Sequence, residues 1–279
     1  MSKGFLILAS NTPTVNYVEQ AYALAVSIKR TQKEISSVSI VTDDILPEKY
    51  ASVFDNIIPL NNGNENTRFA VNGRWRLFHV TPYDETIVLD SDMLLLTDVS
   101  YWWEYCERFD LLFCAKIKNY LGEAVTDTVY RKTFIENNLS NPYFGLHYFK
   151  KRDIPLAFYK QLKFIIKNWH ECCNKFTPEN KQEIPSMDLA SAIAIKTLAI
   201  EDEVFDNLSP LVFTHMKPAI QNWGLNSQPW PDLTTPHINN NGDFLVSNIK
   251  QTGLFHYVEK DFLTPSLVSQ VEELLHEVR

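Results

Sequence analysis

The stretch Thr86-Ile-Val-Leu-Asp90-Ser91-Asp92-Met-Leu-Leu-Leu96 places two carboxylates, one residue apart, inside an otherwise apolar run. A buried carboxylate costs free energy unless it is paired or binds a metal, and a second like charge beside it raises that cost. In an extended segment, residues i and i+2 point to the same side. Asp90 and Asp92 can therefore reach one ion while Ser91 points away. We expect a buried parallel strand that delivers both aspartates to a metal site.

The chemistry of this pair predicts the kind of ion. Hard carboxylate oxygens suit Mg²⁺ or Mn²⁺, and such ions commonly neutralise charge on a phosphate or diphosphate leaving group. In open α/β sheets, ligands bind at the carboxyl ends of the strands. The alternative is a turn with two solvated aspartates. The apolar run that resumes at Met93 argues against that alternative.

The first 100 residues alternate between strand and helix patterns. Apolar runs at 5–9, 38–42 and 57–58 predict strands, and the apolar spacing from Tyr17 to Ile28 predicts a helix. A further helix over 74–80 leads into the strand that carries Asp90. This alternation predicts an α/β fold with a Rossmann-like, mostly parallel sheet flanked by helices.

The remaining residues continue the pattern less regularly. We expect strands at 111–115, 145–149 and 253–258, and helices at 154–169, 187–198 and 265–278. Thr264 and Pro265 have the residue types that commonly open a helix. The segment 221–243, rich in Asn, Pro and Trp, is predicted to be a long loop, and such loops are often functional. Its aromatic residues are either packed or shape an acceptor site, and they include Trp223, Trp230 and His237.

Length and composition limit the class of protein. A chain of 279 residues with 45% hydrophobic and 22% charged residues is long enough for one large domain. The net charge of −8 argues against a nucleic-acid partner. The four cysteines show no metal-binding spacing, so we expect reduced thiols. Without a signal peptide pattern or a long apolar run, we expect a soluble, cytoplasmic protein with no transmembrane segment.

A sheet with Asp-X-Asp near residue 90 resembles the GT-A fold glycosyltransferases, and more narrowly glycosyltransferase family eight, the glycogenin-like and galactosyltransferase-like retaining enzymes. The resemblance covers residues 4 to 200 well and the tail loosely. Three further stretches carry it, and they are Phe5-Leu-Ile-Leu-Ala-Ser-Asn11 with Tyr17 and its helix, Arg74-Trp-Arg-Leu-Phe-His-Val-Thr-Pro-Tyr83, and Ser186-Met-Asp188-Leu-Ala-Ser191. The resemblance implies a single domain 1–279, with a nucleotide-binding half 1–100, an acceptor-side half 101–263 and a C-terminal helix 264–279.

The resemblance also implies a ligand set for the metal. Asp90 and Asp92 would hold Mn²⁺ or Mg²⁺ against the diphosphate of a nucleotide sugar, and a histidine after the last strand would complete the set. His256 has the better spacing and chain order, and His215 is the alternative. A histidine ligand favours Mn²⁺ over Mg²⁺.

Other residues take implied roles around the nucleotide sugar. Asp188 and Arg74 are the implied catalytic residues. Asp188 would contact the donor sugar or the acceptor, with helix capping as the alternative interpretation. Arg74 and either Lys260 or Lys217 would neutralise the diphosphate. The predicted nucleotide-sugar contacts are Ala9, Asn11, Tyr17, Arg74, Asp90, Ser91, Lys260 and Lys217.

The function implied is the transfer of a hexosyl unit from a nucleotide sugar, UDP-linked by resemblance, to an unknown carbohydrate or other glycan acceptor, with retention. A phosphatase of the haloacid dehalogenase type would use the first aspartate as a nucleophile, but that motif usually ends the first strand. A nucleotidyltransferase usually has a Gly-rich, basic loop after its first strand, which Ser10-Asn-Thr-Pro-Thr14 lacks. A non-catalytic nucleotide-sugar-binding protein on the same scaffold is the remaining alternative.

Overall fold

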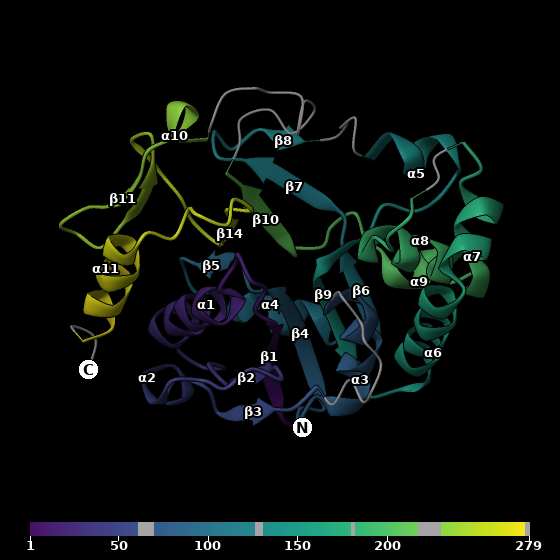
Figure 1. The fold of residues 1–279 in the computed structure, drawn as a ribbon, viewed down its shortest axis with the longest axis horizontal. Coiled ribbons are helices and arrows are strands. Elements are labelled where there is room, and N and C mark those ends of the chain that lie inside the picture. Colours follow the sequence, from purple (N-terminus) through teal and green to yellow (C-terminus); the bar gives the residue numbers. More distant parts are fainter. Residues whose placement is uncertain (61–69, 126–130, 180–181, 217–229, 277–279) are drawn as a thin grey trace.

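A computed structural model describes residues 1–60, 70–125, 131–179, 182–216 and 230–276 (Figure 1). Its main sheet has the strand order β3-β2-β1-β4-β9-β6. These strands are β1 (Lys3–Leu8), β2 (Val38–Val41), β3 (Asn56–Ile58), β4 (Glu85–Asp90), β6 (Leu111–Cys114) and β9 (Tyr143–Lys150). β1 pairs in parallel with β2 and β4, and β2 with β3, whereas β9 runs antiparallel to β4 and β6. The predicted mostly parallel α/β sheet is confirmed.

Helices cover both faces of the main sheet. The longer ones are α1 (Tyr17–Thr31), α6 (Asp153–Lys167), α7 (Trp169–Phe176), α8 (Met187–Leu198) and α11 (Pro265–His276), and the shorter ones are α2 (Glu48–Ala51), η1 (Ala70–Arg76), α3 (Leu77–Val80), α4 (Ser100–Cys106), α5 (Lys132–Glu136), α9 (Glu201–Val204) and α10 (Trp230–Leu233). Successive residues of a strand point to opposite faces. Phe5 and Ile7 of β1 therefore pack with α1 and α4, whereas Leu6 and Leu8 pack with α6 and α8.

The helix starts follow the local sequence. Asn16 accepts the Glu19 N–H at 3.1 Å before α1, and Thr264 accepts the Leu267 N–H at 3.2 Å before α11, as its residue type predicted. The helix expected over 154–169 is present as α6, but it ends at Lys167, and a second helix, α7, begins at Trp169. At the break, both the side chain and the backbone N–H of Asn168 donate to the Phe164 carbonyl, at 2.8 and 3.0 Å.

A second sheet stands beyond the carboxyl end of β4. Its order is β5-β14-β10-β7-β8, and its strands are β5 (Met93–Leu95), β7 (Lys116–Asn119), β8 (Ala124–Val125), β10 (Val212–His215) and β14 (Leu254–His256). β5 runs antiparallel to β14, and β10 runs parallel to both β14 and β7. The chain leaves the main sheet at Asp90 and enters the second sheet at Met93. The two sheets therefore meet at the Asp-Ser-Asp segment.

A third, three-stranded sheet corrects the expectation of a long loop over 221–243. β11 (Pro236–Ile238) pairs with β12 (Phe244–Val246), which pairs with β13 (Ile249–Lys250), all antiparallel. Gly242, at φ +76°, forms part of the turn between β11 and β12. Trp223 lies outside the described residues, whereas Trp230 donates to Asp261 at 2.7 Å and packs on Phe262, which is the packed alternative.

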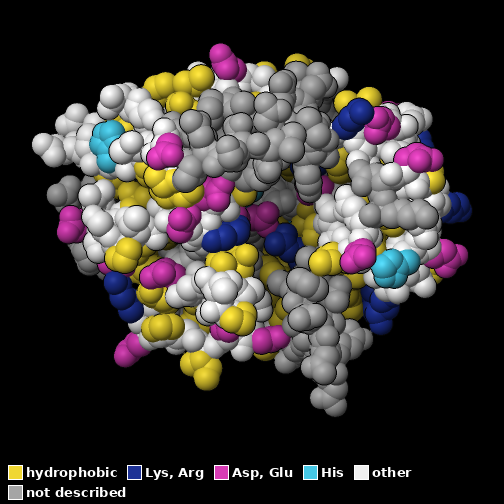
Figure 2. All heavy atoms as spheres, turned by 45° about the horizontal axis from the view of Figure 1, so that its top comes forward, with side chains coloured by type: hydrophobic (Ala, Val, Ile, Leu, Met, Phe, Trp, Pro, Cys, Tyr) yellow, Lys and Arg dark blue, Asp and Glu magenta, His cyan; other side chains and the backbone are white. Residues whose placement is uncertain are grey.

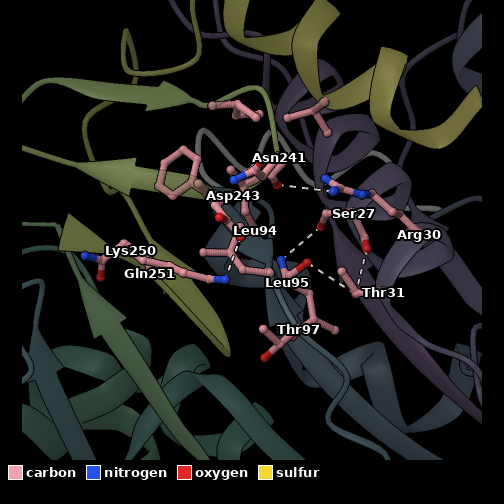
Figure 3. A pocket seen from close by; sticks show the side chains of 15 residues that line it. Ser27, Arg30, Thr31, Leu94, Leu95, Thr97, Asn241, Asp243, Lys250 and Gln251 are labelled. Carbon is pink, nitrogen blue, oxygen red and sulfur yellow. Dashed lines mark hydrogen bonds and ion pairs between the residues drawn. The ribbon is translucent and has the colours of Figure 1, made fainter. Parts of the chain in front are cut away.

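The three-stranded sheet packs beside α1 and β5 around a cavity of about 150 Å³ (Figure 3). Arg30 donates to the Gly242 carbonyl at 3.2 Å, and Thr31 donates to the Leu95 carbonyl at 3.3 Å. These contacts join α1 to the three-stranded sheet, through Gly242, and to the second sheet, through Leu95 of β5.

Two class-level expectations can be compared with these residues. All four cysteines are free and buried, in agreement with reduced thiols. Among the described ranges, no helix combines the length and apolarity that crossing a membrane requires.

Candidate metal and diphosphate site

Three side chains converge where the main and second sheets meet. Single ligand atoms of Asp90, Asp92 and His256 all lie within 4.8 Å of one another. Asp90 ends β4, and His256 ends β14, where it lies opposite Met93 of β5. The expectation that both aspartates lie on one extended strand is wrong, because the main-sheet register ends at Leu8 opposite Asp90 and the chain then turns. The turn, rather than the pleat of a strand, brings the two carboxylates together.

The position of Asp90 depends on an ion pair with Arg74 and on the space that Gly145 leaves beside it. Arg74 Nη1 lies 2.7 Å from Asp90 Oδ1. Burial opposes the charge of Arg74, but the Asp90 carboxylate outweighs it and raises the pKa of the guanidinium. On the neighbouring strand, a Cβ built on Gly145 would lie 2.3 Å from Asp90 Oδ2. Glycine at this position therefore leaves the space that the carboxylate occupies.

Asp92 is more deeply buried, at 6% exposed, and has two cationic or potentially cationic neighbours. Lys260 Nζ lies 2.5 Å and His256 Nε2 lies 3.2 Å from Asp92 Oδ2. Burial acts to raise the pKa of Asp92, but His256 and Lys260 outweigh it and hold the pKa well below its usual range. The ammonium of Lys260 also lies 5.3 Å from the ring centre of Tyr17.

The donor set fits a divalent cation. Two carboxylates and one imidazole are suitable ligands for Mn²⁺ and related ions. The Gly145 position next to Asp90 leaves one carboxylate oxygen unobstructed by a side chain. Figure 2 shows a hollow near the centre of one face of the molecule, where basic and acidic side chains meet. These residues can hold a cation and present positive charge beside it.

The alternative histidine lies on the neighbouring strand. His215 is in register with His256, with ring centroids 6.0 Å apart, but it does not belong to the converging group of described residues. Lys217, the alternative lysine, lies outside the described residues. The geometry therefore places His256 and Lys260 beside the aspartates, and their roles as ligands stay predictions.

The expected nucleotide contacts lie around the end of β1 and the start of α1. Ala9 is buried and donates its N–H to the Val41 carbonyl at 3.1 Å. Asn11 accepts the Val18 N–H at 3.0 Å, so its side chain supports the start of α1. Tyr17 begins α1, and Ser91 is buried in the turn between the aspartates. Their contacts with a nucleotide stay predictions.

Asp188 does not cap its own helix, so that alternative interpretation is wrong. Ser186 precedes α8, and the Asp188 carboxylate instead reaches β9, where Oδ1 accepts the Phe144 N–H at 2.8 Å. Its Oδ2 pairs with Arg131 at 2.6 Å. Arg131 is 3% exposed, stacks on Tyr143 and also donates to the Pro142 carbonyl. Asp188 thus holds the start of β9 through Phe144, the residue before Gly145, which faces Asp90.

Sequence reasoning missed Arg131 and the role of Gly145. A glycine inside an apolar strand pattern signals a close approach of another group, so Gly145 had a usable signal. Arg131 had none, since its partners Asp188 and Pro142 are brought to it by the tertiary fold.

The comparisons with known proteins concern structure. No family model matches the sequence, and no curated protein matches it by sequence. The structure is similar to mouse xyloside xylosyltransferase 1, over 95% of this chain and 100% of that one, with a TM-score of 0.57 and 11% identity. It is similar to the galactosyltransferase LgtC over 98% of this chain and 95% of that one, with a TM-score of 0.52 and 11% identity. This chain has the GT-A fold.

One further match concerns length. The chain spans 60% of the glycosyltransferase GlyE of Streptococcus pneumoniae, at 12% identity and a TM-score of 0.48. The GT-A fold confirms the fold class expected from the resemblance. On this GT-A scaffold the converging aspartates lie at the carboxyl end of the parallel strands, where ligands of open α/β sheets bind.

Proposed function

We propose that this chain is a metal-dependent glycosyltransferase that moves a hexosyl unit from a UDP-sugar to a carbohydrate or other glycan acceptor. The observation that carries the proposal is the convergence of Asp90, Asp92 and His256 at the end of a GT-A sheet. Arg74 and Lys260 contact the same two carboxylates. The glycosyltransferases that share the fold support the proposal, and LgtC was solved with donor and acceptor sugar analogs.

The proposed chemistry divides charge between the protein and an ion. Asp90, Asp92 and His256 would hold Mn²⁺, which when bound stabilises negative charge on a diphosphate leaving group. Arg74 and Lys260 would add positive charge to the same oxygens from fixed positions. A diphosphate departs without needing a proton, so no general acid is assigned. Retention of the anomeric configuration is part of the proposal through the family resemblance.

We assign Asp188 a positioning role toward the donor sugar. One of its oxygens accepts the Phe144 N–H and the other pairs with Arg131. A carboxylate has about four acceptor positions, so capacity remains for a sugar hydroxyl. Ala9, Asn11, Tyr17 and Ser91 are proposed to line the nucleotide.

The alternatives differ in what they require of Asp90. In a haloacid dehalogenase phosphatase Asp90 would be the nucleophile, but here it is paired with Arg74 and ends β4 rather than the first strand. A nucleotidyltransferase would also use a metal at the sheet end. A non-catalytic protein would bind the nucleotide sugar without turnover.

The test is calorimetric binding of UDP with and without Mn²⁺. The wild type is expected to bind UDP in a manganese-dependent way, and Asp92→Asn is expected to lose that binding. Asp243→Asn, which removes a surface carboxylate paired with Lys250, is the matched control and should bind as the wild type does. UDP-sugar hydrolysis would then identify the sugar and separate turnover from binding alone. Absence of UDP binding with or without metal would refute the UDP-sugar proposal.

A further inference from the structure

One oxygen of the metal site already has a cation. Asp92 Oδ2 accepts Lys260 Nζ at 2.5 Å, and the imidazole of His256 lies 3.2 Å from the same atom. The backbone around this lysine is fixed, since Gln20 donates to the Lys260 carbonyl at 3.2 Å. Its side chain is 36% exposed, so the ammonium has a path away from Asp92.

A metal ion bound to Asp92 and the ammonium of Lys260 on Asp92 Oδ2 compete for the same carboxylate. A divalent cation is bound by a carboxylate oxygen at about 2.0–2.6 Å, which would leave it within a few ångströms of Nζ in the observed position. At this separation, two positive charges in a partly buried site repel each other strongly. The lysine must therefore leave Asp92 for the ion to bind at full strength.

Arg74 differs from Lys260 in its freedom to move. Arg74 is half-buried, with 22% of its side chain exposed, lies over the ring of Phe144 and pairs with Asp90 through a planar guanidinium. Lys260 has a flexible four-carbon stem and a compact charge. Its ammonium lies between Asp92 and the ring of Tyr17. Of these two cations, Lys260 has the more mobile side chain and is therefore the one that can move from Asp92 to another partner.

We propose that Lys260 is an exchangeable counter-ion, which neutralises Asp92 in the absence of a divalent cation and transfers to the diphosphate when the cation and nucleotide bind. This rests on the proposed function, and it adds that the metal and the diphosphate bind cooperatively through one side chain. Each ligand then provides what the other needs. The metal frees the ammonium, and the diphosphate accepts it.

The exchange predicts opposite effects of one substitution. In Lys260→Met, Mn²⁺ alone should bind about fivefold or more tightly than in the wild type, because the competing ammonium is gone. UDP in saturating Mn²⁺ should bind about fivefold or more weakly, because its cation is gone. Thermodynamic reciprocity makes both changes appear as a loss of coupling between the two ligands.

The measurement is Mn²⁺ binding by electron paramagnetic resonance, with and without UDP, and UDP binding by calorimetry. Lys29→Met is the matched control, since Lys29 pairs with Asp55 at 2.6 Å away from the site and should leave every constant unchanged. Thermal unfolding verifies that Lys260→Met is folded. Lys260→Arg keeps the charge and should not strengthen Mn²⁺ binding.

The outcomes separate this inference from the proposed function. Weaker UDP binding with unchanged or weaker Mn²⁺ binding in Lys260→Met would make Lys260 a plain diphosphate ligand and overturn the exchange. The proposed function would survive that result. If the wild type binds neither Mn²⁺ nor UDP, both the proposed function and the exchange are refuted.

Discussion

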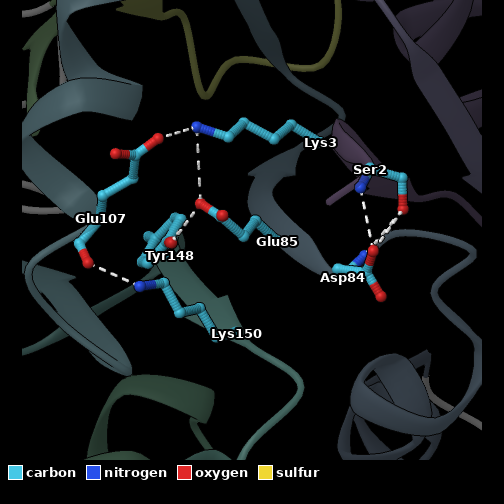
Figure 4. Close-up of polar contacts among 7 residues, drawn as sticks. All are labelled: Ser2, Lys3, Asp84, Glu85, Glu107, Tyr148 and Lys150. Carbon is cyan, nitrogen blue, oxygen red and sulfur yellow. Dashed lines mark hydrogen bonds and ion pairs between the residues drawn. The ribbon is translucent and has the colours of Figure 1, made fainter.

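Strand β4 carries an acidic residue at each end, and the two ends differ in how the charge is balanced. At its amino end, Glu85 is 4% exposed, accepts the Tyr148 hydroxyl at 2.6 Å and lies 3.8 Å from Lys3 Nζ (Figure 4). Lys3 also pairs with Glu107, whose carbonyl accepts Lys150 at 2.5 Å. At this end Lys3 is shared by Glu85 and Glu107, and Tyr148 and Lys150 complete the contacts. At the carboxyl end, two carboxylates converge with an imidazole within 4.8 Å.

The difference shows why an ion pair alone does not indicate a function. The Glu85 network closes on itself and satisfies a buried carboxylate, which is a requirement of burial. At the other end Asp90 pairs with Arg74 and Asp92 with Lys260, but here the two carboxylates and the His256 imidazole also bring ligand atoms within 4.8 Å of one another. Convergence, rather than pairing, separates a candidate site from a structural contact.

The largest expected effect comes from filling the space beside Asp90. In Gly145→Ala, the new Cβ would lie 2.3 Å from Asp90 Oδ2, so the carboxylate must rotate away from its position. Manganese-dependent UDP binding should weaken by about 100-fold or more, since ligand geometry is displaced, while thermal stability changes little.

Gly4 provides the control at the other end of the sheet. A Cβ on Gly4 would lie 2.3 Å from the ring of Tyr83, which is buried. Gly4→Ala should therefore lower stability but leave the UDP affinity of the folded protein unchanged. Wild-type UDP affinity in Gly145→Ala would contradict the assignment of Asp90.

The second effect concerns the amino end of β4, where Glu85 lies. Tyr148→Phe removes the hydroxyl that donates to Glu85. Burial of Tyr148, together with the nearby Glu85 carboxylate, raises the pKa of this hydroxyl far above its ordinary value. The free energy of unfolding should fall by about 2 kcal/mol, as for a hydrogen bond to a charged group. Urea denaturation measures the loss. Altered Mn²⁺ or UDP binding in this variant would mean that the two ends are coupled.

The third effect concerns His147 of β9, which pairs with the middle of β4. His147 lies opposite Val88, donates from Nδ1 to the Phe144 carbonyl and accepts the Tyr159 hydroxyl, both at 2.7 Å. Burial lowers its pKa from 6.5 to about 4. The unfolded chain therefore binds more protons between these values, so stability falls as pH drops below 6.5.

The size of this effect follows from the same two values. At pH 5.5 His147 should account for a loss of about 1.4 kcal/mol relative to neutral pH. His147→Gln should lack this part of the pH dependence, measured as the difference between wild-type and variant unfolding at pH 7.5 and 5.5. Parallel pH profiles would show that His147 does not titrate as a buried neutral group.

The smallest effect is expected from Lys3→Met. Lys3 is largely covered and lies 3.8 Å from Glu85, while its closer partner Glu107 is half exposed. Such pairs contribute about 1 kcal/mol or less, and methionine keeps the apolar stem. Urea denaturation should show a small loss of stability. A loss larger than that of Tyr148→Phe would mean that the lysine, not the hydroxyl, balances Glu85.

Much of the fold was predictable because its signals are local. The apolar runs of β1, β2 and β4 and the helical spacing of α1 lie within single segments, and Thr264 forms its cap with Leu267 three residues away. The break at Asn168 was missed, since the apolar pattern continues across it. The small sheet at 236–250 was missed because its strands are stabilised by pairing rather than by their own composition.

The site divides in the same way. The sequence by itself predicted that Asp90 and Asp92 act together, because two like charges in an apolar run favour binding of a common cation. Only the tertiary structure placed His256 rather than His215 beside Asp92, since both end parallel strands in register and β14, which carries His256, pairs with β5. The contact of Gly145 with Asp90 and the pairing of Arg131 with Asp188 likewise join residues more than fifty positions apart. Such contacts depend on how strands and helices pack, and no local pattern records them.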